Sequence, residues 1–363
     1  MKDIDSSRLK TGILVINPGS TSTKIAVYDG EDEIFGKTLR HAAKDLAEYE
    51  NIADQLPFRK ALVMDALKEE GLEPEDFVAV VCRGGLIRPL ESGTYRVNRA
   101  MVDDCREGIQ GEHASNLGAM IGYELEQEWE VPAFIVDPPS VDELDAKAKV
   151  SGHPIIKRTS LFHALNQKAV ARRYAKEKGV PYEDLRLVVC HMGGGVSGGA
   201  HLGGRIVDTE NSLGGDGPFT PTRAGSMPVN GIIDLCFSGE HDRDEIITMM
   251  TREGGMIAYT GTSSMQELLR RAGEGDEDVA LIIEAFIYQM AKEVASMSVA
   301  LRGRVDAIIL TGGIAHSEEL MARLMEQIDW IAPITVYPGE EEMLALAQGA
   351  LRVLEGEEEA REY

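Results

Sequence analysis

The fold is indicated first by the segment Ile13-Leu-Val-Ile-Asn-Pro-Gly-Ser-Thr-Ser-Thr-Lys-Ile-Ala-Val-Tyr-Asp29. An apolar run rich in β-branched residues enters a turn of small polar residues, and a second apolar run at 24–28 leaves it. This arrangement predicts a β-hairpin with a polar tip. The arrangement recurs in Leu187-Val-Val-Cys-His-Met-Gly-Gly-Gly-Val-Ser-Gly-Gly-Ala-His201, where we expect the returning strand at 203–207.

A third copy of the pattern, Asp306-Ala-Ile-Ile-Leu-Thr-Gly-Gly-Ile-Ala-His-Ser-Glu-Glu-Leu320, leaves its turn differently. Ser317 suits a helix N-cap and two glutamates follow it, so this strand should lead into a helix. Because strands and helices alternate along the chain, the fold class is α/β. Further helices are expected at 48–70, 99–128, 163–178, 278–301 and 341–354, and further strands at 79–82, 134–136 and 334–337.

The repetition of the hairpin near residues 13 and 187 predicts two similar domains. We place them at 1–150 and 151–340, with a final helix in 340–363 that packs back on the first domain. A chain of 363 residues is long enough to build two such cores.

The composition excludes several classes of partner. Lys and Arg number 37 and Asp and Glu number 61, so the net charge of −24 opposes binding to nucleic acids and to anionic membrane surfaces. The longest apolar stretch, 279–301, contains charged residues and predicts a buried or amphipathic helix. The 4 cysteines form no Cys-x-x-Cys pair and the first residues lack an apolar signal segment, so we expect a reduced, cytoplasmic protein.

The first hairpin tip has the chemistry that a phosphate group needs. Asn17, Ser20, Ser22 and Lys24 offer an amide, two hydroxyl groups and an ammonium group without bulk. Serine and glycine are also the usual residues of ordinary turns, so the tip taken alone fits both interpretations equally.

The second tip, Gly193-Gly-Gly-Val-Ser-Gly198, formally matches the Gly-x-Gly-x-x-Gly pattern of dinucleotide-binding enzymes. That function requires a helix that opens at the last glycine, whereas here the chain continues into a second turn. A glycine-lined phosphate turn between two strands fits better, and an NAD-dependent oxidoreductase would depend on this stretch alone. The chain has no Gly-x-x-x-x-Gly-Lys-Ser/Thr motif, which excludes a P-loop.

Taken in order, these motifs resemble the acetate and sugar kinase, Hsp70 and actin superfamily, and within it the acetate kinase family. The family resemblance is carried by Asn17-Pro-Gly-Ser-Thr-Ser-Thr-Lys24, Phe162-His163, Cys190-His-Met-Gly-Gly-Gly195 and Phe219-Thr-Pro-Thr-Arg-Ala-Gly225. Four further segments are similar to family members that act on butyrate: Cys82-Arg-Gly-Gly-Leu86, Gly93-Thr-Tyr-Arg-Val-Asn98, Asp137-Pro-Pro139 and Thr311-Gly-Gly-Ile-Ala-His-Ser317. The resemblance implies two duplicated ribonuclease-H-like (actin-like ATPase) domains that flank a nucleotide cleft.

The resemblance implies transfer of the γ-phosphoryl group of ATP to a carboxylate, for which arginine is the expected counter-charge. It implies that Arg83 and Arg223 contact the acyl and phosphoryl groups and that Asp137 lies close to them. It also implies that His163 donates a hydrogen bond to the phosphoryl group in flight. From residue type alone, each arginine also fits a surface salt bridge, and His163 fits a histidine at a helix end.

Contacts with ATP or ADP are implied on both hairpin tips and on a later glycine loop. His191 would reach the γ-phosphate, although a satisfied histidine at a strand end fits the sequence nearly as well. The other implied nucleotide contacts are Asn17, Ser20, Ser22, Lys24, Gly193, Gly194, Gly195, Gly312, Gly313 and Ile314. The chain departs from acetate kinases at Ser263-Ser-Met-Gln-Glu267, which lacks the Asp-x-Arg element that touches the nucleotide.

A magnesium ion is implied as the second cofactor. Asn17 and Glu342 are the candidates for oxygens linked to Mg²⁺, directly or through water. Glu341 is the alternative to Glu342, and both glutamates also fit favourable charges in the first turn of a helix.

The acyl pocket is expected at Gly84, Gly85, Phe162 and Pro221. The loop before Arg223 is shorter than in acetate kinases, which favours a longer acid. We therefore expect reversible formation of acyl phosphate from butyrate or a similar short-chain or branched fatty acid. The alternatives are acetate or propionate as the substrate, and a nucleotide-driven binding module of the Hsp70 or actin type. The resemblance also implies a homo-oligomer, a dimer or larger.

Overall fold

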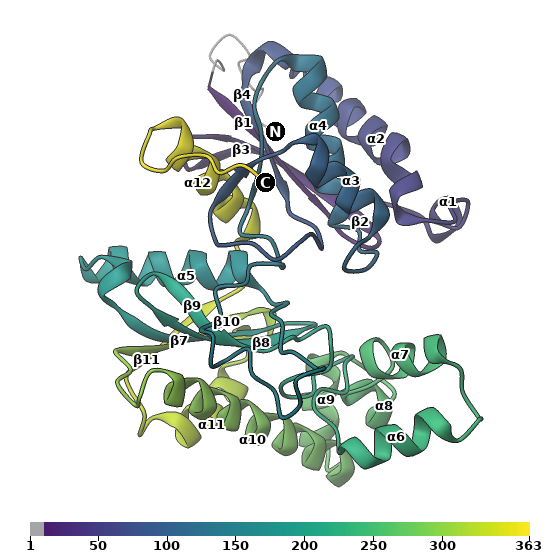
Figure 1. The fold of residues 1–363 in the computed structure, drawn as a ribbon, viewed down its shortest axis with the longest axis vertical. Helices are drawn as coiled ribbons and strands as arrows, with labels where there is room; N and C mark the ends of the chain where they lie inside the picture. The colour runs from purple at the N-terminus through teal and green to yellow at the C-terminus, as the bar shows by residue number, and fades with distance from the viewer. Residues whose placement is uncertain (1–10) are drawn as a thin grey trace. The chain divides into compact units, whose positions relative to one another are not determined.

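The computed structural model describes residues 11–363 and divides the chain into two compact units. Unit 1 is Met1–Val141, described from residue 11 onward, together with Glu341–Tyr363, and unit 2 is Asp142–Glu340 (Figure 1). The first boundary thus falls at 141/142, whereas the sequence placed it near 150. Residues 142–150 stay with unit 2 because Asp145 N donates to Val207 O at 2.9 Å and Ile206 N donates to Glu143 Oε2 at 2.8 Å.

A mixed β-sheet forms the core of unit 1. Among the described residues this sheet has six strands in the order β3-β2-β1-β4-β6-β5. The strands are β1 (Gly12–Pro18), β2 (Ser22–Asp29), β3 (Asp32–Arg40), β4 (Phe77–Arg83), β5 (Thr94–Arg96) and β6 (Ala133–Val136). β2 is antiparallel to both β1 and β3, whereas β4 and β6 run parallel to β1. Strands β1, β4 and β6 are almost wholly buried apolar runs, as expected of parallel strands covered on both faces.

Helices cover both faces of this sheet (Figure 1). On one face, Leu14, Val80 and Ile135 belong to a core that also includes residues of α2 and α4. On the other face lies α12 from the end of the chain, whose Gly349 sits against Val136 with no room for a side chain. The helical segments of unit 1 are α1 (Ala43–Leu46), η1 (Ile52–Gln55), α2 (Leu56–Glu69), η2 (Pro74–Asp76), α3 (Arg99–Glu107), α4 (Asn116–Trp129) and α12 (Glu342–Leu354).

Unit 2 is built on a second mixed sheet. Its five strands within the described chain follow the order β11-β10-β7-β8-β9. They are β7 (Arg186–Met192), β8 (Val196–Leu202), β9 (Arg205–Thr209), β10 (Ala307–Gly312) and β11 (Ile334–Pro338). One face of this sheet packs on α5 (Ala164–Lys178) and the other on α10 (Glu277–Ala300) and α11 (Glu318–Ile328) (Figure 1).

The two sheets share one topology. The order β9-β8-β7-β10-β11 matches β3-β2-β1-β4-β6 strand by strand, with two antiparallel pairs on one side and two parallel pairs on the other. The hairpins β1–β2 and β7–β8 therefore occupy equivalent places in the two units. This repetition confirms the duplicated α/β fold that the two hairpins predict.

Two expectations about individual elements are wrong. The helix expected at 99–128 is two helices, because Gly108 adopts a left-handed conformation with φ of 61° and ends α3. The strand that returns from the second tip is β8, which starts at Val196 directly after the three glycines, and the expected 203–207 strand corresponds to β9. β8 is a strand where a dinucleotide-binding motif would require a helix, which removes that interpretation.

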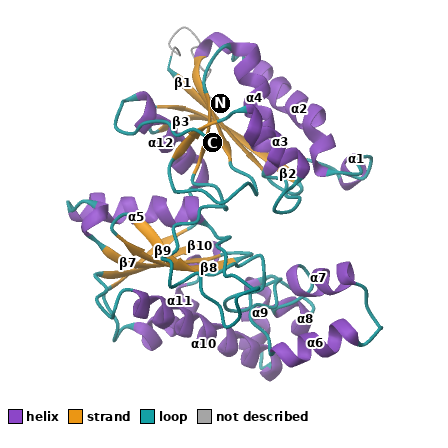
Figure 2. Ribbon diagram, in the orientation of Figure 1, coloured by secondary structure: helices purple, strands orange, loops and turns teal. Residues whose placement is uncertain are grey.

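A helical region that the sequence analysis did not predict lies between β9 and α10. Helices α6–α9 lie beside one end of α10 (Figure 2). They are α6 (Val229–Phe237), α7 (Arg243–Thr251), α8 (Met256–Thr260) and α9 (Met265–Gly273), and the remaining 3₁₀ segments of unit 2 are η3 (Tyr182–Asp184) and η4 (Gly313–His316). No helix within residues 11–363 combines the length and the apolar character needed to cross a membrane.

Candidate active site

The first hairpin tip is held from beneath by a buried arginine. Gly19 N donates to Ser22 O at 2.7 Å, which closes the turn between β1 and β2. Arg59 of α2 is 1% exposed and donates to the main-chain oxygens of Gly19 at 2.6 Å, Ser20 at 3.2 Å and Ser22 at 3.3 Å. Burial lowers the pKa of Arg59 to about 10. The side chain of Lys24 is exposed beside this braced tip.

Sequence reasoning missed Arg59. It lies inside a predicted helix, 40 residues from Gly19, and nothing in its neighbourhood marks it as a support for the tip. Gln55 Oε1, one helical turn earlier, accepts from Arg59 Nε at 3.0 Å and from Nη2 at 2.8 Å. The guanidinium is thereby fixed in one orientation.

Three predicted residues of unit 1 meet at the carboxyl ends of β1 and β4. Asn17 Nδ2 donates to Glu342 Oε2 at 2.8 Å, and Arg83 Nη1 forms an ion pair with Glu342 Oε1. The side chains of Arg83 and Glu342 are only 12% and 17% exposed. The residue before Glu342, Glu341, adopts a left-handed conformation with φ of 39°, which is strained for a residue with a side chain.

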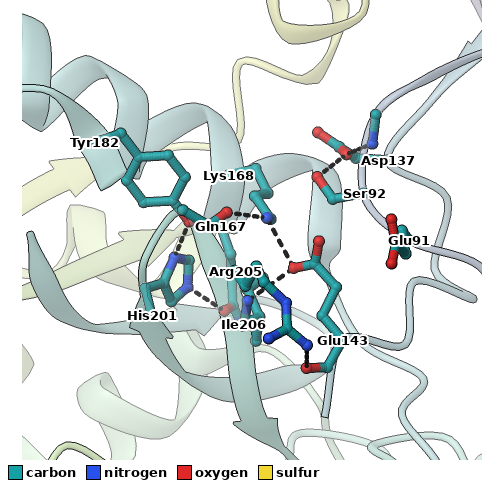
Figure 3. A network of polar contacts seen from close by, with 12 residues as sticks. Glu91, Ser92, Asp137, Glu143, Gln167, Lys168, Tyr182, His201, Arg205 and Ile206 are labelled. Carbon is teal, nitrogen blue, oxygen red and sulfur yellow. Dashed lines mark hydrogen bonds and ion pairs between the residues drawn. The ribbon is translucent and has the colours of Figure 1, made fainter. Parts of the chain in front are cut away.

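Asp137 lies at the end of β6 and is fully buried. Its Oδ1 accepts from Ser92 Oγ at 2.6 Å and from Gly93 N at 2.8 Å (Figure 3). The main chain of Asp137 is also left-handed, with φ of 40°. Because these donors order both Asp137 and the turn before β5, the carboxylate has a clear positioning role within unit 1.

The two glycines of the expected acyl pocket have structural neighbours. A Cβ on Gly85 would come within 2.7 Å of Asn116 Cα, and one on Gly84 would meet Pro138. Both positions are therefore glycine because β4 ends in close contact with α4 and with the segment after β6. Their small size does not by itself indicate a ligand.

In unit 2, two histidines stack beside the tip of the second hairpin. The rings of His163 and His191 are 3.8 Å apart between centroids and inclined by 13°. His163 precedes α5, and its Nδ1 lies 2.8 Å from Ser197 Oγ. His191, near the end of β7, places Nδ1 2.8 Å from Asn166 Oδ1 and Nε2 3.5 Å from Glu340 Oε1.

Arg223 reaches the same place from the loop after β9. A Cβ on Gly195 would lie 2.7 Å from Arg223 Nη1 and 3.2 Å from His163 Cε1, so this glycine lets both side chains approach the tip. Thr220 Oγ1 accepts from Arg223 N at 3.0 Å and donates to Gly194 O at 3.2 Å, which ties the arginine turn to the glycine turn.

The guanidinium of Arg223 is desolvated without a balancing charge. It donates to Ser212 O at 3.3 Å, and it has no carboxylate partner among residues 11–363. Burial lowers the pKa of Arg223. An arginine in this state attracts an anion, because a carbonyl dipole offsets little of a full charge.

The remaining predicted residues of unit 2 lie on two segments. Phe162 is 4% exposed and Pro221 is also buried, beside His163 and Arg223 in the chain. Gly312 ends β10 with φ of 94° and packs against the main chain of Met192. Gly313 has open space on its α-carbon, and Ile314 is buried in η4. An open glycine beside an apolar residue is a suitable surface for a flat aromatic ring.

The structure thus gathers the predicted residues into two groups, one in each unit. Unit 1 brings together Asn17, Arg83 and Glu342, and unit 2 brings together His163, His191, the glycine tip and Arg223. These features define a class of protein. The chain has the duplicated actin-like ATPase fold of acetate and sugar kinases, with a desolvated arginine and paired histidines at one of the hairpins.

The chain belongs to the acetokinase family, whose model matches residues 148–337. It is 52% identical to butyrate kinase 1 of Clostridium acetobutylicum over 351 residues, covering 97% of this chain and 99% of that protein. It is 50% identical to butyrate kinase 2 of the same organism over 355 residues, covering 98% of this chain and 100% of that protein. Membership of this kinase family brings ATP and ADP as phosphoryl donor and acceptor.

Solved structures of the same fold are more distant in sequence. Acetate kinase of Porphyromonas gingivalis matches with a TM-score of 0.77 at 16% identity, covering 94% of this chain and 99% of that chain. A propionate kinase from Francisella tularensis matches with a TM-score of 0.74 at 21% identity, covering 93% and 98%. These likenesses confirm the fold.

Proposed function

We propose that this protein transfers the γ-phosphoryl group of ATP reversibly to the carboxylate of butyrate or a similar short-chain fatty acid, giving acyl phosphate and ADP. The observation that carries the proposal is Arg223, a desolvated guanidinium beside two histidines and a glycine turn, with no carboxylate partner in the described chain. Such a group suits a reaction in which two anions meet. The names of the two relatives support butyrate as the acid.

The reaction needs positioning and charge neutralisation. A carboxylate oxygen of the acid bonds to the γ-phosphorus while the bond from that phosphorus to the bridging oxygen breaks, and ADP leaves with that oxygen. We assign Arg223 to the charge on the phosphoryl group in flight. His163 and His191 flank the same position. We assign His163 as the hydrogen-bond donor to a phosphoryl oxygen in flight and His191 to a position beside the γ-phosphate.

The two hairpin tips and the β10 loop are assigned to the nucleotide. Main-chain N–H groups of 193–195 and the groups of Ser20, Ser22 and Lys24 suit phosphate oxygens. Gly312, Gly313 and Ile314 are assigned to the adenosine. Arg83 is assigned to the acyl or phosphoryl group, for which it would exchange part of its ion pair with Glu342.

Asp137, Phe162 and the pocket glycines have supporting assignments. Asp137 orders Ser92 and Gly93 and is assigned to positioning the end of β6. Phe162 and Pro221 are assigned to the wall of the acyl pocket, because both are buried next to the histidine and the arginine. Burial of each further methylene of the acid contributes about 0.8 kcal/mol, so neighbouring acids should be separated only modestly.

The residues at the end of β1 fit a magnesium ion. Asn17 turns its amide nitrogen to Glu342, so that pair supplies an amide oxygen and a carboxylate, both of which are hard donors. The described residues contain no group of three or more His, Cys, Asp or Glu side chains that would hold a metal on their own. We therefore assign Asn17 and Glu342 to Mg²⁺ directly or through water. When bound, the ion would neutralise phosphate charge.

Trapping the product as a hydroxamate tests the proposal. Purified protein is given MgATP and acetate, propionate, butyrate, isobutyrate or valerate, and acyl hydroxamate is measured for each. We expect the highest kcat/KM at four carbons and no product with excess EDTA. An optimum at acetate or propionate would keep the chemistry and reject the substrate. No product from folded, ATP-binding protein with any acid would reject the enzyme in favour of a nucleotide-driven binding module.

We also propose a cytoplasmic homo-oligomer. Cys82, Cys105 and Cys190 are buried free thiols, which fits a reducing compartment. Helix α10 carries Leu281, Tyr288 and Val299 on one face, exposed by 65%, 59% and 73%. An apolar stripe of this kind suits contact with a second copy. Sedimentation of the wild type and of Leu281→Glu should show a dimer or larger species that the variant weakens.

A further inference from the structure

We infer that Gln167, Ser197 and His201 form a directed hydrogen-bond chain that holds His163 in the tautomer with its hydrogen on Nε2. The chain makes these residues positioning residues for phosphoryl transfer, so its catalytic consequence rests on the proposed function. Its structural basis lies wholly within unit 2.

The direction of the chain is set at Gln167, in the first turn of α5. Gln167 Nε2 lies 3.2 Å from Ser197 O and 3.0 Å from Ser197 Oγ. A main-chain oxygen only accepts, so the nitrogen of the amide must face Ser197 and its oxygen must face the other way. Gly199 leaves the room for this arrangement, because a Cβ there would clash with Gln167 Oε1.

His201 and Tyr182 continue the chain away from Ser197. His201 Nε2 lies 3.1 Å from Gln167 Oε1, which only accepts, so this ring nitrogen carries the hydrogen (Figure 3). The other nitrogen, Nδ1, then accepts from the hydroxyl of Tyr182 at 2.7 Å. Burial and the charges of Lys168 and Arg172 hold the pKa of His201 well below its ordinary value, which keeps the ring neutral.

Ser197 links Gln167 to His163, and its hydroxyl group sets which atom donates to the histidine ring. Its Oγ accepts from Gln167 Nε2 at 3.0 Å and from the main-chain N–H of His163 at 3.3 Å, which fills both acceptor positions of a hydroxyl. The hydroxyl hydrogen is left for His163 Nδ1 at 2.8 Å. Nδ1 must therefore carry a lone pair, and the neutral ring of His163 bears its hydrogen on Nε2.

The stacked partner has the opposite arrangement. Asn166 Nδ2 donates to Glu340 O at 3.0 Å, so Asn166 Oδ1 faces His191 Nδ1 and that nitrogen must carry the hydrogen. Two consecutive residues of α5, Asn166 and Gln167, thus impose opposite tautomers on two rings 3.8 Å apart. When both rings are neutral, Nε2 of His163 is a donor and Nε2 of His191 is an acceptor. Only His163 can then donate from Nε2 to an anionic phosphoryl oxygen.

Nitrogen-15 NMR of protein labelled at histidine reads the tautomer directly. In the wild type, the neutral His163 ring should show a protonated Nε2 and an unprotonated Nδ1. Gln167→Glu keeps the shape but replaces the donor to Ser197 with an acceptor, so the serine hydroxyl turns toward the new carboxylate. His163 should then place its hydrogen on Nδ1. A wild-type ring with its hydrogen on Nδ1, or an unchanged tautomer in Gln167→Glu, overturns the inference.

Steady-state kinetics distinguish a role in positioning His163, which affects kcat, from a role in substrate binding, which affects KM. Loss of one donor to a developing charge costs about 10²–10³-fold in kcat. We expect a loss of that order in Gln167→Glu and in Ser197→Ala, with little change in KM for ATP or butyrate. Ser197→Ala also guards against misfolding of Gln167→Glu, because it removes one hydroxyl only. A loss confined to KM in both variants would contradict the inference.

Tyr182→Phe is the matched control. It removes the hydroxyl at the far end of the chain and leaves the groups from Gln167 to His163 in place. We expect the wild-type tautomer and a kcat within about twofold of wild type. A loss in Tyr182→Phe as large as in Gln167→Glu would mean general damage to the core and reject the directed chain. The tautomer needs no turnover, so an inactive wild type with hydrogen on Nε2 rejects the proposed function alone.

Discussion

Arg83 in unit 1 and Arg223 in unit 2 are the same residue type, yet only one of them has a carboxylate partner among the described residues. Arg83 is paired with Glu342, and that carboxylate is held in turn by Asn17. Arg223 is half-buried, donates to the main-chain oxygen of Ser212 and has no acidic partner in residues 11–363. In unit 1, the charge of Arg83 is therefore neutralised by Glu342. In unit 2, the charge of Arg223 is not neutralised by any described carboxylate. If the proposed function is correct, this difference predicts a larger catalytic contribution from Arg223 than from Arg83.

Replacing Arg223 should have the largest effect. Arginine that stabilises a phosphoryl group in transfer contributes about 10³–10⁵-fold to kcat, and we expect Arg223→Ala to lose activity in that range. The fold should tolerate the change, because removing a desolvated and unpaired charge relieves a cost. Hydroxamate formation and thermal unfolding measure the two effects.

Arg223→Lys is the control that separates the effect of the positive charge from that of the planar guanidinium group. Lysine keeps one positive charge but has no planar fork, so it should recover only a small part of the lost rate. If Arg223→Ala stays within tenfold of wild type, the contrast between the two arginines loses its catalytic meaning.

Replacing Arg83 should reduce activity less and alter stability more. We expect Arg83→Ala to lower kcat by about 10²-fold, as for one donor to a developing charge. It should also lower the free energy of unfolding, because Glu342 keeps its burial and loses its cation. A double-mutant cycle with Glu342→Gln, measured by urea unfolding, should give a coupling energy of about 1–3 kcal/mol. Strictly additive stabilities would show that the ion pair contributes nothing.

Local sequence predicts where Arg83 and Arg223 lie in the two units, but not which side chains they contact. The strand-turn-strand patterns at 13–29 and 187–201 predict both hairpins, and the Pro-Thr-Arg-Ala-Gly context of Arg223 predicts that it lies in a loop. The sequence could not show which residues these groups contact, because Glu342 is 259 residues from Arg83 and Arg59 is 40 residues from Gly19. Such pairs follow from how α12 and α2 pack on the sheet, and no short-range pattern encodes that packing.

The histidines show the same limit at shorter range. Sequence could place His163 before a helix and His191 at a strand end. It could not show that the rings stack, or that Ser197 and Gln167 set a tautomer, because the contacts join α5 to β8. The sequence predicts a phosphate turn at Gly193, Gly194 and Gly195. Gly195 and Gly199 also leave space for side chains of this protein, which local sequence does not indicate.

Replacing Arg59 tests the support beneath the first tip. Arg59→Met keeps much of the volume and leaves the carbonyls of the turn without their donor. We expect KM for ATP to rise about tenfold, equivalent to about 1.4 kcal/mol. The free energy of unfolding should fall by about 3 kcal/mol, because hydrogen bonds to charged groups are strong and buried acceptors become unsatisfied. Nucleotide titration and urea unfolding measure the two.

The next residue of the same helix supplies the matched control. Lys60 pairs with Glu124 and Glu128, whose side chains are 42% and 53% exposed. Lys60→Met should cost about 0–1 kcal/mol and leave KM for ATP unchanged. Equal effects of the two variants would place the importance of Arg59 in general helix stability and not in the tip.

The second hairpin has two glutamates beside strand β8, whereas the first hairpin has Arg59 beneath its tip. Glu210 accepts from Gly198 N at 2.6 Å, and a Cβ on Gly198 would lie 3.0 Å from Glu293 Cγ. Burial raises the pKa of both glutamates, and the neighbouring Glu293 raises that of Glu210 further. The folded state therefore holds protons that the unfolded state releases above its ordinary pKa of 4.5.

Stability from this pair should therefore fall as pH rises above 4.5 through the raised folded-state pKa. Glu293→Gln removes one of the two ionisable groups. The free energy of unfolding of the wild type should therefore fall more steeply with rising pH than that of Glu293→Gln. The difference between the two slopes is at most about 1.4 kcal/mol per pH unit for each proton concerned. Urea unfolding from pH 5 to 9 measures it, with Glu284→Gln on the exposed side of α10 as the control. Parallel curves would show that the two carboxyl groups share no proton, and the electrostatic contrast between the hairpins would then depend on Arg59 alone.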